Sequence, residues 1–210
     1  MAMMDEGFHP LPERSSVVLG VLEGNWGVDI DQAFRGCLGA CDFKSMPISL
    51  PLMAAAHQAG LAIISAENWT AFGSIVDHPE LGEDIRLRLR ASSEVAADQL
   101  ANAREIQAQF RAEVDAALAQ VDALILPSLP SPAPLLEEAR DPAKIVDHTR
   151  LLRPFNVSGH PAISLPYETD AGEPFGIQIV GRRMADEELC AIAREVERRI
   201  TKSVPMENLS

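Results

Sequence analysis

The sequence predicts an α/β protein in which a mixed sheet is covered by helices. Short apolar runs that end at proline or glycine predict buried strands, and longer stretches with apolar residues every three or four positions predict helices. The two kinds of segment alternate along the chain, as in a sheet with helical cover. We expect one domain over residues 17–202, an extended or disordered lead-in at residues 1–16 and a tail at residues 203–210.

The composition limits the classes of partner. The chain has 210 residues and a formal net charge of −13, so like charge opposes a nucleic-acid backbone and we expect no nucleic-acid partner. No apolar run reaches the roughly 18 residues of a membrane-spanning helix, so we expect no membrane partner. Three cysteines without framework spacing favour free thiols in a reducing cytoplasm. We expect neither a cofactor nor a metal.

The first half alternates predicted strands and helices. Residues 17–22 and 44–50 predict two strands, and the helix between them could be capped by Asp29 or Asp31. Residues 52–72 predict a helix that is apolar nearly all round, which is typical of a buried helix. Glu67 lies inside that helix, and we interpret it as a carboxylate held by backbone or by a basic partner.

Two further helices follow a turn at residues 78–82. Residues 84–89 begin the first, and Ser92 or Ser93 is expected to cap a second, long amphipathic helix. The residues expected to form its buried stripe are Ala96, Leu100, Ala103, Phe110, Val114 and Leu118.

The second half predicts three more strands and a last helix. The strands are residues 121–126, 162–165 and 175–180, each closed by proline or glycine. The proline-rich loop at residues 127–134 cannot pair as a central strand. The last helix is expected to begin at Asp186, with acidic residues in its first turn and basic residues at its far end, as the helix dipole favours.

Two linked motifs in this half indicate a family. Residues 156–164 read NVSGHPAIS, and residues 172–181 read GEPFGIQIVG. Both resemble, in the right order, the C-terminal part of the amidase signature family, whose members are serine hydrolases that cut amide bonds. The resemblance covers residues 17–200 and implies the C-terminal portion of an amidase signature fold.

The same resemblance implies catalytic groups that this chain lacks. Family members use a serine nucleophile, a second serine in a cis peptide and a lysine base, with a Gly/Ser-rich segment that holds the oxyanion. No Gly-Gly-Ser-Ser run occurs here, and Lys44, Lys144 and Lys202 stand in no matching context. We therefore expect no catalytic residue in this chain and no amide hydrolysis by the chain alone.

Substrate contacts are expected beyond the carboxyl ends of the strands. That rule favours the loop after Leu126 and the loop before Ala162. The candidate substrate-binding residues in these loops are Ser128, Phe155, Asn156, Ser158, Gly159 and His160. Alternatively, Asn156 and Ser158 only fasten a turn through bonds to the backbone, with Gly159 at positive φ.

Other patterns are weaker signals. Cys37, Cys41, His57 and Cys190 lack the paired spacing of a zinc site, so we interpret the cysteines as buried thiols. Asp147 and His148 with Ser158 form no recognisable hydrolase elbow. His9, His78 and His160 adjoin prolines and are expected to be exposed, and Trp26 and Trp69 are expected to pack in the core.

Two functions remain open. The chain is the C-terminal part of an amidase-family hydrolase that an N-terminal half would complement, forming one wall of a pocket for a small amide. Alternatively, it is a non-catalytic binding or regulatory module. Half a sheet leaves an edge and an apolar face uncovered, so an N-terminal half or a second copy is the expected partner.

Overall fold

The fold was examined in a computed structural model, which describes residues 9, 11, 12, 14, 16–24, 26–138, 146–169 and 172–203. Nearly all of the predicted tail and most of the predicted lead-in lie outside the described residues. In the described part of the chain, no helix combines the length and the hydropathy that crossing a bilayer requires.

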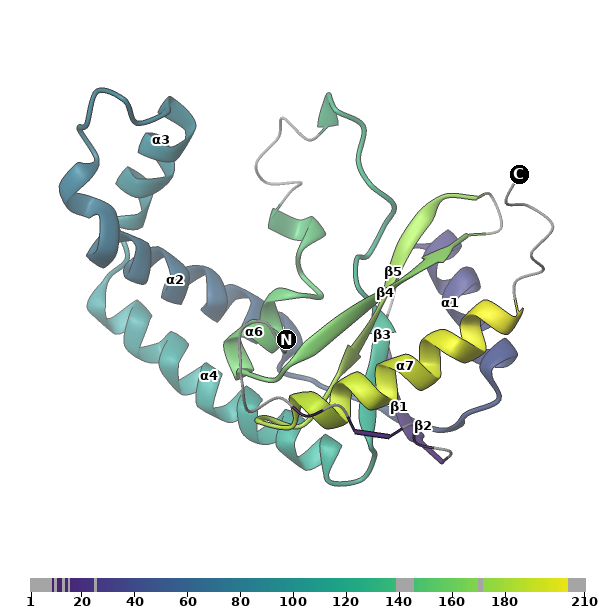
Figure 1. The fold of residues 1–210 in the computed structure, drawn as a ribbon. Helices are drawn as coiled ribbons and strands as arrows, with labels where there is room; N and C mark the ends of the chain where they lie inside the picture. Colours follow the sequence, from purple (N-terminus) through teal and green to yellow (C-terminus); the bar gives the residue numbers. More distant parts are fainter. Residues whose placement is uncertain are drawn as a thin grey trace.

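A five-stranded mixed sheet forms the centre of the fold, as predicted (Figure 1). The strand order is β2-β1-β3-β5-β4. β1 pairs with β2 and β3 in parallel, whereas β5 pairs antiparallel with β3 and with β4. The strands are β1 (Val18–Leu22), β2 (Lys44–Ile48), β3 (Ala123–Pro127), β4 (Ala162–Glu168) and β5 (Pro174–Val180).

Helices cover the sheet in two groups. α1 (Val28–Cys41) and α7 (Asp186–Ser203) pack against each other and against the sheet, and Figure 1 shows α7 lying across the strands. α2 (Met53–Phe72), α4 (Ala97–Leu118) and α6 (Arg153–Ser158) form the second group. One large cluster of buried apolar side chains joins the sheet to both groups, and its fully enclosed residues include Phe110, Phe155 and Ile192.

Two predicted helix caps are wrong. α1 begins before the position that an Asp29 or Asp31 cap requires, with Gly27 as the N-cap, so both aspartates fall in its first turn, where the helix dipole favours them. Ser92 and Ser93 end α3 (Glu83–Ser92) instead of starting α4, because each hydroxyl donates to a carbonyl of α3, from Arg88 and Arg90 respectively.

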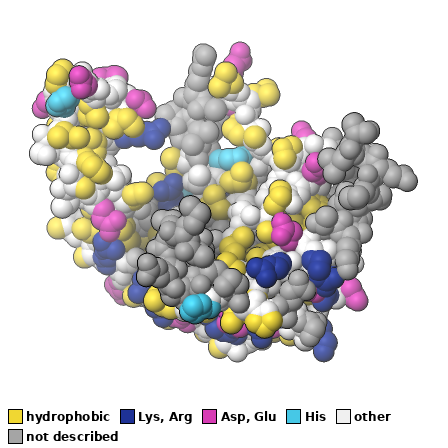
Figure 2. Space-filling model, viewed as in Figure 1, with side chains coloured by type: hydrophobic (Ala, Val, Ile, Leu, Met, Phe, Trp, Pro, Cys, Tyr) yellow, Lys and Arg dark blue, Asp and Glu magenta, His cyan; other side chains and the backbone are white. Residues whose placement is uncertain are grey.

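α2 is less buried than its sequence predicts. Ala56, His57, Ala59, Gly60, Ala62 and Ile63 are buried, but Ile64, Trp69 and Phe72 are 46%, 37% and 51% exposed. The far end of α2 continues through a 3₁₀ turn, η1 (Gly73–Ile75), into α3, and this arm projects from the body (Figure 1). Figure 2 shows hydrophobic side chains on the arm beside acidic ones.

Glu67 has a basic partner, as interpreted from the sequence. Its Oε1 accepts a hydrogen bond from Arg104 of α4 at 2.7 Å, and both side chains are exposed. The pair therefore joins α2 to α4 on the surface and has no catalytic setting.

The C-terminal elements match the prediction in kind. β4 runs three residues past its predicted end at Leu165, because Pro166 leaves the ladder to β5 intact. α6 replaces the predicted turn, and Gly159 closes it with φ 76°, which confirms the expected positive φ. α7 begins at Asp186 as predicted, with three acidic residues in its first turn.

Candidate functional site

A crevice opens beyond the carboxyl ends of β1 and β2, where an α/β sheet places ligands. Its volume is about 810 Å³. The walls come from the end of β1 (Leu22, Glu23), the residues after β2 (Leu50, Pro51) and the first turns of α2. Its polar side chains are those of Glu23, His57, Gln58, Asp147 and Arg150. The site therefore combines an apolar floor with both signs of charge at its rim.

His57 carries the clearest sign of an unmet interaction. Its side chain is 5% exposed, and its Nδ1 is buried with no hydrogen-bond partner in the described part of the chain. Burial lowers the pKa of His57, and the nearby Arg153 cation lowers it further, so the imidazole is neutral near pH 7. A buried ring nitrogen without a partner costs free energy unless a ligand or water bonds it.

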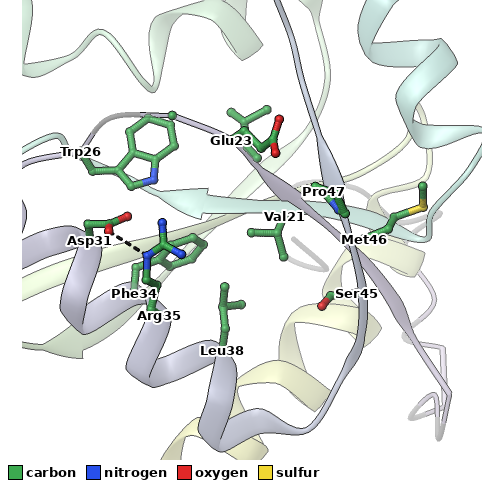
Figure 3. A pocket seen from close by; sticks show the side chains of 12 residues that line it. Val21, Glu23, Trp26, Asp31, Phe34, Arg35, Leu38, Ser45, Met46 and Pro47 are labelled. Atoms are coloured by element: carbon green, nitrogen blue, oxygen red, sulfur yellow. Dashed lines mark hydrogen bonds and ion pairs between the residues drawn. The ribbon is translucent and has the colours of Figure 1, made fainter.

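Trp26 separates this crevice from a second hollow. It is 7% exposed and contributes to both, so its predicted packing role is confirmed, whereas Trp69 is 37% exposed. The second hollow has a volume of about 460 Å³ and lies between α1 and the β2 edge (Figure 3). Asp31 and Arg35 form an ion pair at 2.8 Å on its α1 side.

The loop after β3 lies next to the segment that follows β1, but none of its residues lines the crevice. The Gly27 N–H donates to the Pro130 carbonyl at 3.1 Å, which ties this loop to the end of β1. A smaller hollow of about 390 Å³ lies between the proline-rich loop and the segment that carries Asp147 and His148. The Ser131 hydroxyl and His148 Nδ1 lie 3.2 Å apart there.

Ser128 lies at the start of that loop, and its polar groups bond to residues of β4 and β5. It is 5% exposed, its N–H donates to the Gly176 carbonyl at 2.7 Å, and its hydroxyl lies 2.8 Å from the Ser164 hydroxyl. Gly176 is required beside it, because an added Cβ would lie 2.6 Å from Ser128 Oγ. No basic group is among these partners, so Ser128 lacks the activation that a nucleophilic serine needs.

The loop before β4 lies at the other end of the sheet. β3 pairs antiparallel with β5, and β5 pairs antiparallel with β4, so β4 starts at the amino end of β3. The structure therefore does not bring residues 156–160 to the crevice that Ser128 and the β3 loop adjoin. The expectation that both loops share one end is wrong, because the sequence does not show in which direction β4 runs.

The side chains of this second loop form a buried network. Ser158 is fully buried and donates to the Phe155 carbonyl at 3.1 Å. His160 Nδ1 lies 2.9 Å from Ser158 Oγ, and its Nε2 lies 3.2 Å from Asp115 Oδ1. Arg183 bonds the same carboxylate at 3.0 Å, and this bond, with that from His160, lowers the pKa of Asp115.

Ser158, His160 and Asp115 form a structural hydrogen-bond network and not a catalytic triad. His160 is 5% exposed, so the expectation of an exposed ring is wrong, and burial lowers its pKa. A serine without solvent access cannot reach a substrate carbonyl. Phe155 is likewise fully buried, against Phe110 with ring centroids 6.2 Å apart, whereas Asn156 and Gly159 are exposed. These contacts favour the alternative in which Ser158 fastens a turn.

The remaining sequence patterns form no catalytic or metal site in the described residues, although Asp147 lines the crevice. His148 contacts Ser131 and not Ser158, so the sequence grouping of Asp147, His148 and Ser158 is not assembled. The three cysteines are free thiols, and Cys37 and Cys41 are buried. A hydrogen bond with Cys41 and burial raise the pKa of the Cys37 thiol. Within the described residues, no group of three or more His, Cys, Asp or Glu side chains is placed to hold a metal.

Comparison with known proteins identifies the family of this fold. The sequence model of the family described as Amidase matches residues 43–190, more than half of the chain. The chain belongs to the amidase family. A solved amidase superposes with a TM-score of 0.79 and 28% identity, over 90% of this chain and 47% of that chain. The fold class is therefore that of amidase structures, as the two sequence motifs indicated.

Curated amidase-family relatives are matched over a shorter part. A putative amidase, AmiD, of Mycobacterium bovis is 34% identical over 127 residues, which is 58% of this chain and 26% of the relative. A glutamyl-tRNA(Gln) amidotransferase subunit of Pseudothermotoga lettingae is 32% identical over 122 residues, which is 56% of this chain and 26% of the relative. The chain thus spans about a quarter of the length of these curated relatives and about half of the solved amidase.

Proposed function

We propose that this chain is the C-terminal part of an amidase-family hydrolase of carbon–nitrogen bonds and that it is inactive alone. In this proposal its crevice forms one wall of the substrate pocket, and a lysine base and a serine nucleophile come from an N-terminal half. The observation that carries the proposal is that nearly all of this chain superposes on only 47% of a solved amidase.

The crevice supplies the groups that a small amide would meet. An amide nitrogen donates and its carbonyl accepts, and Glu23, Gln58 and Arg150 offer matching groups on the lining of the crevice. Ser128 is bonded within the sheet, and we propose no direct contact with the substrate. We assign Ser158 and His160 to holding the turn, and we propose no contact of Asn156 or Gly159 with a substrate in the crevice, because both precede β4 at the other end of the sheet.

The setting of the serines supports the absence of activity. Ser128 and Ser158 are at most 5% exposed and are bonded to neutral groups or to a buried imidazole. We place the protein in the cytoplasm, because Cys37, Cys41 and Cys190 are all free thiols. We treat residues 17–202 as one partial domain.

A labelling experiment tests the inactivity. The purified chain is incubated with a fluorophosphonate and its intact mass is measured, in parallel with ammonia release from benzamide and propionamide. We expect no adduct and no ammonia. Stoichiometric labelling of one serine, with turnover lost when that serine is changed to alanine, would show that the chain contains its own nucleophile.

The second candidate is a binding module without catalysis. The crevice favours it, because the residues that line it all belong to this chain. Calorimetric titration of the isolated chain with the same amides separates the two candidates. Saturable binding that His57→Phe abolishes, without turnover in the presence of an N-terminal amidase half, would favour the module.

A further inference from the structure

The second hollow, between α1 and the β2 edge, contains a hydrogen-bond donor that no described protein group meets. Trp26 is 7% exposed, and its indole N–H makes no hydrogen bond with any residue that the structure describes. Among the described residues only His57 Nδ1 and Arg153 Nε are both enclosed and unpartnered, so the indole nitrogen stays open to the hollow. A tryptophan N–H can only donate, and a buried one usually has a partner.

The backbone holds the Trp26 ring in this position. A Cβ at Gly24 would lie 2.2 Å from Trp26 Cη2, so only glycine lets the chain pack against the six-membered ring. The loop is anchored at its start by the bond from the Glu23 N–H to the Ile48 carbonyl, at 2.8 Å, and at its end by the bond from the Gly27 N–H to the loop after β3. The indole nitrogen is therefore in place before a ligand arrives, which lowers the cost of binding.

Arg35 supplies further donors on the facing wall. Its Nε donates to Asp31 at 2.8 Å, and its Nη groups have no hydrogen-bond partner in the described part of the chain. Figure 3 shows the indole nitrogen of Trp26 and the guanidinium of Arg35 pointing toward one another. Neither group can accept a hydrogen bond, so the two fit an oxygen of a ligand between them. A guanidinium is suited above all to a carboxylate.

The charge of the lining disfavours a simple anion. Glu23 and Asp31 contribute two negative charges and Arg35 one positive charge, which leaves one net negative charge on the lining. The Glu23 side chain has no partner among the residues that the structure describes, so its carboxylate can accept from a ligand. The whole chain carries a formal charge of −13, which opposes an anion further. The ligand therefore needs a positive group as well as an oxygen acceptor.

Apolar side chains make up much of the remaining lining. Val21, Phe34, Leu38 and Met46 all contribute to it. The volume of about 460 Å³ lies within the usual range for small-molecule sites. A molecule that carries a carboxylate, an ammonium and a short apolar group would meet all three parts of the hollow.

We propose that the second hollow binds a small zwitterion, an α-amino acid with an apolar side chain. Its carboxylate accepts from the Trp26 N–H and from Arg35, its ammonium donates to Glu23, and its side chain packs against Leu38 and Met46. The site is separate from the crevice, although Trp26 and Glu23 line both. The inference goes beyond the proposed function and does not depend on it, because it needs neither a catalytic group nor an N-terminal half.

Calorimetric titration of the full chain with three probes tests the class of ligand. L-Leucine carries both charged groups, 4-methylpentanoate lacks the ammonium, and 3-methylbutylamine lacks the carboxylate. We expect saturable binding of L-leucine and binding about tenfold weaker or less for the other two, because each loses a charge-assisted hydrogen bond. No saturable binding of L-leucine, or equal binding of either analogue, would overturn the proposal.

Three single substitutions locate the site. Arg35 is 74% exposed, so Arg35→Met should keep the fold and weaken L-leucine binding about tenfold or more. Arg104→Met removes a comparable surface ion pair outside both hollows and should leave the affinity unchanged. Gln58→Ala changes the lining of the crevice alone and should also leave it unchanged. Binding that Gln58→Ala weakens and Arg35→Met does not would place the ligand in the crevice and overturn the proposal.

The indole proton reports directly on the donor. The chain has 2 tryptophans, so in a Trp69→Phe background Trp26 gives the one indole N–H signal in a proton spectrum. We expect this signal to move downfield when L-leucine binds, because the N–H then donates to a carboxylate oxygen, and to stay in place with 3-methylbutylamine. An unchanged signal at saturation with L-leucine would overturn the assigned role of Trp26 and, with it, the proposed site.

Discussion

Arg182 and Arg183 are adjacent and similarly exposed, at 39% and 41% of their side chains, but they should differ in their effect on stability. Arg182 Nη2 donates to the carbonyls of Leu118 at 3.0 Å and Val121 at 2.8 Å. Leu118 is the last residue of α4, so its carbonyl has no partner inside the helix. Arg182 also pairs with Glu188 at 3.3 Å, and Arg183 makes a surface ion pair with Asp115 at 3.0 Å.

The magnitudes follow from these partners. Hydrogen bonds from a charged donor contribute about 1.5–3 kcal/mol, and partial exposure of Arg182 reduces two of them to about 2 kcal/mol in all. An exposed ion pair contributes about 0.2–1 kcal/mol. For a domain of this size, Arg182→Met should then lower the melting temperature by about 4–8 °C and Arg183→Met by less than about 4 °C.

The assay is unfolding in urea followed by circular dichroism, with thermal melts of the same samples. Salt provides an internal check, because about 1 M NaCl should remove the small effect of Arg183→Met and leave most of that of Arg182→Met. Equal losses in the two variants, or a larger loss in Arg183→Met, would refute the assignment of Arg182 as the cap of α4.

Two further expectations concern packing and pH. An added Cβ at Gly60 would lie 2.6 Å from Val157 Cγ2, so Gly60→Ala should lower the free energy of unfolding by about 1 kcal/mol, even after its gain in helix propensity. Gly36→Ala has no atom within 4 Å of the added Cβ and should raise the free energy of unfolding by up to about 1 kcal/mol. Urea midpoints check both variants, and a gain of stability in Gly60→Ala would contradict the close contact of α2 with α6. Because burial lowers the pKa of His57 and His160, unfolding takes up protons, and stability should fall as pH drops below about 6.5. The lowered pKa of Asp115 adds a loss only below about pH 4. Midpoints from about pH 7.5 to about pH 5 should fall less steeply in the double variant His57→Gln/His160→Gln, and an unchanged slope would contradict the expectation.

Local pattern was enough to predict the five strands and most of the helices, but not α6. The strands and helices follow from apolar periodicity and from proline or glycine at their ends, and the motifs at residues 156–164 and 172–181 identified the family. Helix caps were less predictable, because Ser93 can bond to the helix before it as well as to the one after it. The hydroxyl bond from Ser93 to Arg90 decides between them.

The site could be predicted only in part, because its geometry depends on strand direction. The loop after Leu126 lies where parallel strands end, as expected. His160 lies at the opposite end, since β4 runs in the same direction as β3 and the loop before it falls at the amino end. The sequence shows His57 as an imidazole inside an otherwise apolar helix. It does not show that the ring nitrogen lacks a hydrogen-bond partner, because the residues that bury the ring come from segments far apart in sequence. The exposure of Phe72 was also unpredictable, because an apolar residue in a helix pattern does not show whether another element packs over its side chain.

The order of strands in the sheet also constrains how the chain is assembled during synthesis. β5 lies between β3 and β4, although it follows both in sequence. β1 must likewise wait for β3, which pairs Leu19 with Ala123. A ribosome-bound chain that stops before Pro174 therefore holds β4 without its partner strand, and closure of long loops slows nucleation of such a fold. β5 joins the parallel and antiparallel parts and is the last strand of the described sheet to emerge, so nascent chains expose the sheet until residues 174–180 have been translated.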